Sequence, residues 1–241
     1  MLLVDGDEQR SALDFTELRE QLVGKAGYTA VALHGAALRT QIRQLASKYA
    51  DIVIDVGGRD TGSLRAALTV ADAVLIPVQP RTFDIWAVSQ VAELVREARE
   101  INEGLRAFVI LNAADPSGHD NAEASEAIRD IPGLELLSHA IGRRKIFPNA
   151  TSAGRSVLEH MPCDQKAIDE LEAVLHQSML QSDSRLIAKR PQNTHRTQRA
   201  DEAAEAWIHE ADKPTAVTAP QRRPKKRTGH DPVRSKGAGA C

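Results

Sequence analysis

The sequence predicts an α/β fold in which a doubly wound, mostly parallel sheet carries helices on both faces. Short apolar runs alternate along the chain with segments whose apolar residues recur at helical spacing, and this alternation is typical of parallel crossovers. Aromatic residues make up only 3% of the chain, although 42% is hydrophobic, so the core must consist of Ala, Val, Ile and Leu. Such a core is usual in parallel sheets that are covered on both faces.

The predicted elements follow in a regular order. Short runs of apolar and β-branched residues, bounded by glycine, proline or charged residues, predict strands over 1–5, 28–33, 51–55, 73–78, 107–112 and 134–141. Apolar residues three or four positions apart predict helices over 11–25, 37–49, 63–70, 85–102, 122–130 and 164–180. The first helix should close near Gly24 and Gly27, because glycine adopts the left-handed conformation that ends helices.

The chain divides into an α/β body, residues 1–180, and a basic tail, residues 181–241. From residue 185 onward there are 13 Lys and Arg against 6 Asp and Glu, whereas the preceding part has 18 against 27. We expect the tail to be mostly disordered, apart from a helical patch over 201–210 that holds Trp207. A tail of about +7 beside a body of about −9 suits contact with nucleic acid.

Cysteine usage and hydropathy indicate a cytoplasmic protein. Cys163 and Cys241 offer neither a disulfide framework nor the ligand spacing of a zinc site, which fits a reducing compartment. No apolar run reaches the length of a membrane span, and no signal sequence opens the chain, so no membrane partner is expected.

Acidic side chains end two of the predicted strands. Asp5 and Asp7 close the first strand, and Asp55 closes the third. Because ligands bind at the carboxyl ends of the strands in such sheets, we expect the three carboxylates at one edge, where they suit magnesium and a phosphate. Gly57 and Gly58 follow Asp55 and would let the backbone approach a phosphate closely.

Four segments, taken in order, resemble the ParA/MinD family of deviant Walker A ATPases. They are LLVDGDEQ at 2–9, IVIDVGG at 52–58, AVLIPVQP at 73–80 and VILN at 109–112. In that family a D-x-D segment ends the second strand, a Walker B aspartate precedes a glycine-containing loop, and an asparagine near the base ends a later strand. The resemblance spans about 2–159, and Glu8 stands where the family has proline.

The resemblance implies a DNA-partitioning ATPase that uses ATP and Mg²⁺, for a plasmid, a chromosome or an integrative element. It implies that Asp7 positions the attacking water with support from Asp5, that Asp55 holds the magnesium shell, and that Asn112 lies at the adenine. Gly57 and Gly58 would then belong to the nucleotide site. The expected partners are a second copy in a homodimer, a ParB-like protein that stimulates hydrolysis, and DNA bound without sequence preference.

A basic segment at 141–157 is similar to the family's final strand and base-side loop. In ParA relatives, basic residues in this neighbourhood help the nucleotide-bound dimer to hold DNA. The resemblance therefore implies DNA-binding roles for Arg143, Arg144, Lys145 and Arg155, and an association with the nucleoid.

The sequence lacks the family's phosphate loop, K-G-G-x-G-K-[ST], which follows a first strand in ParA-type proteins. Without its backbone amides and lysines, ATP should bind poorly or not at all. We expect a truncated ATPase that begins at the family's second strand, and the alternative is a loop-less relative that acts as a dimerisation or regulatory partner.

Two other function classes stay open at this point. A two-component receiver domain would accept a phosphoryl group on Asp55, with magnesium held by Asp5 and Asp7. It needs a Ser or Thr ending its fourth strand and a Lys ending its fifth, whereas here those strands end in Val78-Gln79-Pro80 and Asn112-Ala113. A non-enzymatic DNA-binding adaptor would act through the basic tail.

Overall fold

A computed structural model of the chain describes residues 1–59, 61–117, 119–183 and 197–211. Along these residues the elements are β1 (Leu2–Asp5), α1 (Ser11–Val23), β2 (Thr29–Ala32), α2 (Gly35–Leu45), β3 (Ile52–Asp55), α3 (Gly62–Leu68), β4 (Ala73–Val78), α4 (Thr82–Ile101), β5 (Arg106–Ala114), α5 (Asp120–Arg129), β6 (Glu135–Leu136), β7 (Ile141–Gly142), α6 (Ile146–Ser152), α7 (Gln165–Asp183) and α8 (Thr197–Ala211). The predicted alternation of strands and helices is confirmed.

The strands form two parallel sheets rather than one. The first sheet has the order β2-β1-β3, and the second has the order β4-β5-β6 with β7 also paired to β5. Every strand pair among the described residues is parallel, as predicted. In the described part of the chain, β3 pairs only with β1, and β4 pairs only with β5. Strands β3 and β4 therefore each leave one edge unpaired, at the boundary between the two sheets.

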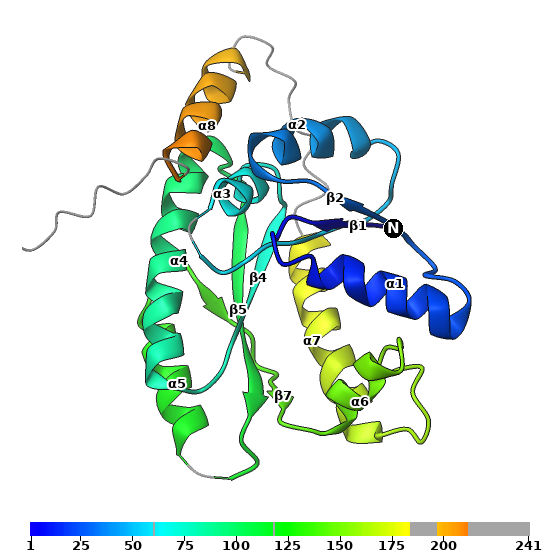
Figure 1. Cartoon of the computed structure of the whole chain (residues 1–241). Helices are drawn as coiled ribbons and strands as arrows, with labels where there is room; N and C mark the ends of the chain where they lie inside the picture. Colours follow the sequence, from blue (N-terminus) through cyan, green and yellow to red (C-terminus); the bar gives the residue numbers. More distant parts are fainter. Residues whose placement is uncertain (60, 118, 184–196, 212–241) are drawn as a thin grey trace, which may run out of the picture.

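Helices cover the sheets on both sides. In Figure 1, α4 and α5 lie along one side of the second sheet, and α7 lies on the other side beside β7. The core is aliphatic, because its fully buried large side chains are Leu, Ile and Val, with Phe108 as the one aromatic ring among those described. This composition confirms the expected core of an α/β protein.

Two segments differ from the prediction. The expected strand over 134–141 is two short strands, β6 and β7, which pair with β5 at different points along its length. Helix α6 lies where a basic loop was expected. Its Pro148 falls in the first turn of the helix, where the missing N–H costs nothing.

The helical patch predicted around Trp207 is helix α8, and it packs against α3, α2 and α4. Helix α7 continues to Asp183, so residues 181–183, which were expected to begin the disordered tail, are helical. The remaining residues of the tail, 184–196 and 212–241, lie outside the described residues. None of the helices in the described part of the chain has the length and hydrophobicity that crossing a lipid bilayer would need.

Candidate functional site

The predicted acidic cluster forms at the carboxyl ends of β1 and β3. The two strands are paired in parallel register with Asp5 opposite Asp55, and the Gly6 N–H donates to the Asp55 carbonyl at 2.8 Å. A Cβ on Gly6 would lie 2.8 Å from Val56 Cγ1, so the turn after β1 needs a glycine to reach β3 this closely. Gly6 was not predicted as a site residue, although its place between two aspartates was the signal.

Asp5 is fully buried, and its carboxylate organises the loop rather than facing a ligand. It accepts hydrogen bonds from the Asp7 N–H at 3.1 Å and from the Leu13 N–H at 2.9 Å. The second bond supplies a cap for α1, because the residue at the N-cap position, Arg10, makes no side-chain capping bond. Asp5 therefore holds the backbone of Asp7 in place, and its supporting role in hydrolysis stays a prediction.

Asp7 lies directly against the loop that follows β3. One carboxylate oxygen accepts from the Gln9 N–H at 3.0 Å, and the other lies 3.0 Å from where a Cβ on Gly57 would be. A side chain at position 57 would therefore press on Asp7. Gly58 has open space around it, since a Cβ there would meet no atom within 4 Å.

Asp55 is exposed and has a pKa raised above the ordinary aspartate value. Partial desolvation is the main cause, and the nearby carboxylates of Asp5 and Asp7 add to it. No three His, Cys, Asp or Glu side chains of the described residues converge into a metal site. The role of Asp55 at a magnesium ion stays a prediction.

We expect Asp55→Asn to raise the melting temperature at pH 7 by about 1–2 °C, because it removes a carboxylate that the folded protein holds ionised at a cost. An acid whose pKa is raised on folding destabilises the protein above that pKa. The gain should therefore vanish below about pH 4, where both states are protonated. Thermal unfolding over a pH series measures it, with Asp51→Asn at the other end of β3 as the control. A lower melting temperature at pH 7 would mean that the Asp55 carboxylate is structurally required.

A cleft of about 840 Å³ separates the two sheets next to this cluster. Its walls are β3 and the first five residues of β4, its lining includes Gly57 and Gly58, and Leu64 and Leu68 of α3 also line it. Val53 is 49% exposed and Leu75 is 43% exposed, which is unusual for apolar residues of parallel strands. One further strand in this cleft could pair with both unpaired edges, because a strand forms hydrogen bonds with a neighbour on each side.

Asn112 belongs to β5 of the second sheet, whereas the acidic cluster belongs to the first sheet. Its side chain accepts from the Ala113 N–H at 2.9 Å, at an irregularity where Ala113 has a φ of 52°. In Figure 1, β5 runs down the picture, whereas β1 runs across it. The role of Asn112 at the adenine base stays a prediction.

The four basic candidates have different surroundings. Arg144 is half-buried and donates to both oxygens of Glu170, which lowers the pKa of that carboxyl. Arg143 is exposed and donates to Asp115 at 3.2 Å. Lys145 and Arg155 are exposed. Arg143 and Arg144 thus already have acidic partners, so Lys145 and Arg155 are more available to a phosphate.

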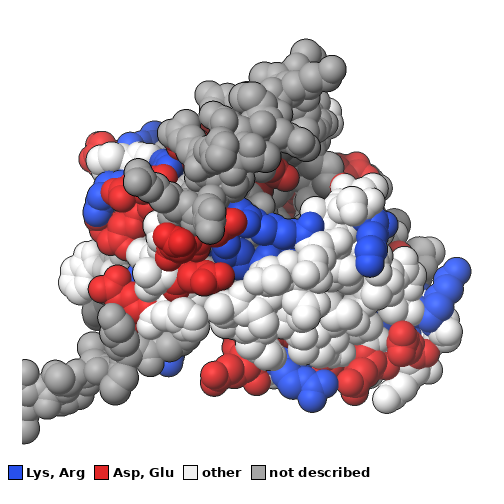
Figure 2. Space-filling model, turned by 90° about the horizontal axis from the view of Figure 1, so that it is seen from above, with Lys and Arg blue, Asp and Glu red and all other residues white. Residues whose placement is uncertain are grey.

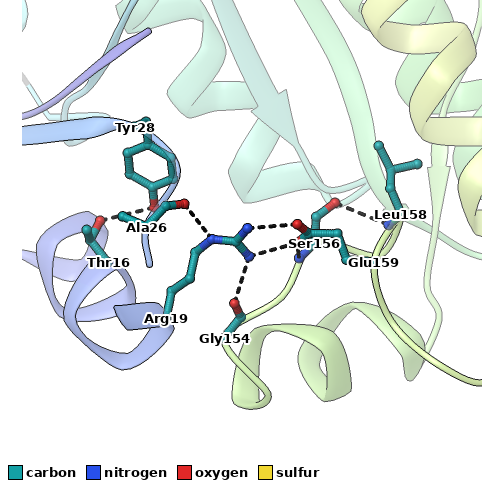
Figure 3. A network of polar contacts seen from close by, with 8 residues as sticks. All are labelled: Thr16, Arg19, Ala26, Tyr28, Gly154, Ser156, Leu158 and Glu159. Carbon is teal, nitrogen blue, oxygen red and sulfur yellow. Dashed lines mark hydrogen bonds and ion pairs between the residues drawn. The ribbon is translucent and has the colours of Figure 1, made fainter. Parts of the chain in front are cut away.

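The segment that carries Arg155 is tied to α1 through Arg19 (Figure 3). The Arg19 guanidinium donates to both oxygens of Glu159 at 2.7 Å, to the Gly154 carbonyl at 2.9 Å and to the Ala26 carbonyl at 2.7 Å. Gly154 has a φ of 64°, and a Cβ there would lie 2.9 Å from Arg19 Cα. Chiefly through the bond from Arg19, the pKa of Glu159 falls to about 2. Sequence reasoning missed this link, because its partners lie far apart in the chain.

Figure 2 shows the face seen from above α8 and α2. Lys and Arg do not form a continuous strip there, because acidic side chains lie between them around a broad uncharged surface. This face of the described residues therefore carries no extended basic track of the kind that would follow a DNA backbone.

Comparisons with known proteins point to one group of ATPases. Maintenance of carboxysome distribution protein A of Halothiobacillus neapolitanus is 31% identical over 106 residues, which cover 44% of this chain and 49% of that protein. The chain thus spans about half the length of the curated relative that it matches. No protein-family model matches the chain.

Solved structures share the fold at low sequence identity. An ATP complex of a Cyanothece McdA variant has a TM-score of 0.57 at 17% identity, over 72% of this chain and 84% of that one. A plasmid partition protein of Borrelia burgdorferi bound to AMPPNP has a TM-score of 0.55 at 16% identity, over 73% and 86%. The cell division ATPase MinD of Pyrococcus furiosus has a TM-score of 0.53 at 19% identity, over 74% and 86%. Together with the curated relative, these likenesses confirm the resemblance to the ParA/MinD-type ATPases.

Proposed function

We propose that this chain, a relative of the ParA/MinD-type ATPases, is the body of a ParA-like positioning ATPase. The observation that carries the proposal is the juxtaposition of Asp7, Asp55 and Gly57 at the carboxyl ends of two paired strands, beside the cleft between the sheets. The experiment is a titration of ATP and Mg²⁺ into a chain that carries an added N-terminal strand and phosphate loop.

The residues divide the chemistry among them. Asp55 would hold the water shell of a magnesium ion on the ATP phosphates, and a cation there would offset both the partial desolvation that chiefly raises the pKa of Asp55 and the nearby carboxylates that add to it. Asp7 would orient the attacking water. The Asp5 carboxylate would hold Asp7 in place, because it accepts a hydrogen bond from the Asp7 backbone N–H. Gly57 would leave room for Asp7, and Gly58 would offer an unobstructed backbone to a phosphate.

The chain as given lacks two parts of such a site. No K-G-G-x-G-K-[ST] loop stands in the sequence, and no strand fills the cleft between the edges of β3 and β4 in the described part of the chain. We infer that a strand in this cleft would end beside Asp55 and deliver the loop that follows it to the phosphates. Without that segment the chain binds ATP poorly, whether it is a truncated ATPase or a loop-less regulatory relative.

The cargo and partners follow from the same proposal. A complete site would bind ATP, form a homodimer on DNA in the nucleoid, and release DNA when a ParB-like partner stimulates hydrolysis. The name of the curated relative, which refers to carboxysome distribution, favours a protein organelle as a second candidate cargo. A tagged chain that follows carboxysomes rather than a plasmid in cells would support the second candidate.

The two other function classes receive less support. In a receiver domain a hydroxyl and a lysine would flank Asp55, but β4 runs into Gln79 and Pro80, and β5 carries Asn112 at the corresponding place. A DNA-binding adaptor without a nucleotide site gives no reason for Asp7 to lie against Gly57 in the neighbourhood of Asp55.

DNA binding by the chain as given should depend on the tail. Residues 212–241 carry 8 Lys and Arg against 2 Asp and Glu, whereas Arg143 and Arg144 already have acidic partners. We expect weak binding to duplex DNA without sequence preference, falling at least about tenfold between 50 and 200 mM salt. Gel shifts should compare the full chain, a truncation after Ala211 that keeps α8, and Arg143→Ala/Arg155→Ala. Undiminished binding by the truncation would move the DNA site onto the body.

A further inference from the structure

Helix α8 lies on a face built by α2, α3 and α4 (Figure 1). Ala204 and Ile208 of α8 are fully buried, and Ile208 joins the core cluster of Leu2, Val4 and the inner residues of α2. Trp207 packs against a different cluster, formed by α3, α4 and the second sheet. The helix therefore contacts the cores beneath both sheets through one short apolar stripe.

Arginines of the body fix both ends of this stripe. Asp201 accepts from Arg39 at 2.7 Å and from Arg43 at 2.6 Å, and Arg39 is only 4% exposed. At the other end, Arg65 donates to the Trp207 carbonyl at 3.0 Å, and its guanidinium lies 4.8 Å from the centre of the indole ring. A buried guanidinium needs an acceptor, so the face requires an acid where Asp201 lies.

Helix α4 completes the recognition. The Trp207 indole N–H donates to Glu97 at 2.8 Å, which fixes the orientation of the ring. The face can thus recognise three features of a helix that docks on it. These are an acid (Asp201), a small residue three positions later (Ala204) and a tryptophan six positions after the acid (Trp207).

The charge of α8 matches the face and contrasts with the tail around it. Four acids against one arginine give the helix a net charge of about −3, within a tail of about +7. A helix of 15 residues is marginally stable alone in water, so α8 depends on its seat. The contact between α8 and the body depends in turn on Ala204, Trp207, Ile208 and the ion pairs with arginine. Because so few side chains make this contact, α8 of one chain can be replaced by α8 of another.

We propose that the α2–α3–α4 face is a helix-docking site with an exchangeable occupant, and that α8 of a second copy docks there in a dimer. Every copy carries both the face and the matching helix, so a reciprocal exchange loses no contact and joins two protomers. A 13-residue connection, the length between α7 and α8, can span roughly 40 Å, enough for exchange between adjacent protomers. The proposal does not depend on nucleotide binding.

Two complementary variants of the full chain test the exchange. Asp201→Ala/Trp207→Ala leaves the face intact with a defective helix, and Arg39→Ala/Arg65→Ala leaves the helix intact with a defective face. We expect a 1:1 complex in sedimentation only when the two are mixed, with circular dichroism showing that both are folded. A mixture of the two folded variants that stays monomeric would overturn the proposal. As a control, the helix-defective variant is mixed with a face-defective chain that also carries both helix substitutions. A complex of equal amount in that mixture would overturn the proposal as well.

A labelled peptide of residues 197–211 gives a second measurement that leaves the body unchanged. It should bind the helix-defective full chain at least about tenfold more tightly than the wild type, in which the attached helix competes at a high effective concentration. The same peptide with Asp201→Ala should bind neither protein. Equal binding to both chains, or no binding to a folded helix-defective chain, would contradict the proposal.

Discussion

Adding an N-terminal strand and the loop K-G-G-x-G-K-[ST] to this chain should create ATP affinity where there was almost none. We expect calorimetry with ATP and Mg²⁺ to show no usable binding by the chain as given, and a gain of at least about 100-fold in affinity after the addition. The physical reason is charge: Asp7 and Asp55 would face a polyanion alone, and desolvation together with the neighbouring carboxylates already raises the pKa of Asp55. Loop amides and lysines would neutralise the phosphates.

The matched control keeps the added strand and replaces the loop lysines with alanine. That variant should fill the cleft between β3 and β4 and gain stability, but it should recover little ATP affinity. Micromolar binding by the chain without any addition would contradict this account, and so would an added segment that leaves both stability and affinity unchanged.

In the same extended chain, Asp7→Ala should lower ATP turnover at least about 100-fold while nucleotide binding and nucleotide-driven dimerisation persist. The Asp7 carboxylate lies against Gly57, so we expect it to orient water in the transition state, whereas binding depends on the loop. Steady-state phosphate release measures turnover, and calorimetry measures binding.

Two further substitutions separate this role from structural effects. Asp51→Ala removes an exposed acid at the opposite end of β3 and should leave turnover unchanged. Asp5→Asn should lower the melting temperature, because Asp5 is buried and accepts two backbone N–H groups that hold the loop and α1. Full turnover by Asp7→Ala would show that another group orients the water.

Local patterns predicted most of the secondary structure. The apolar run of β4 predicts Ala73–Val78, and the structure has the same bounds, because a buried strand ends where polar or turn residues begin. Gly24 ends α1 as expected, with a φ of 85°. Helix α6 was missed, because its residues were assigned by resemblance to the family's base-side loop. Strands β6 and β7 are so short that one apolar run covers both.

Long-range features were harder to predict from the residues. Asp5, Asp7 and Asp55 meet as expected, since strand order alone brings them to one edge. The burial of Arg39 beneath α8 could not be predicted, because an arginine on an amphipathic helix usually faces water. The link from Arg19 to Glu159 depends on residues 140 positions apart, and no local pattern pairs them. The left-handed backbone at Ala113, whose N–H donates to the Asn112 side chain, could not be predicted from the sequence either.

Amide hydrogen exchange tests most directly whether the edges of β3 and β4 are open to a strand that completes the ATP site. In the chain as given, amides of β3 and β4 that point into the cleft should exchange much faster than those of β1 and β5. After the strand and loop are added, they should become as protected as the central strands, and ATP with Mg²⁺ should further protect Gly57 and Gly58. Slow exchange along both edges before the addition, or unchanged exchange after it, would contradict the claim.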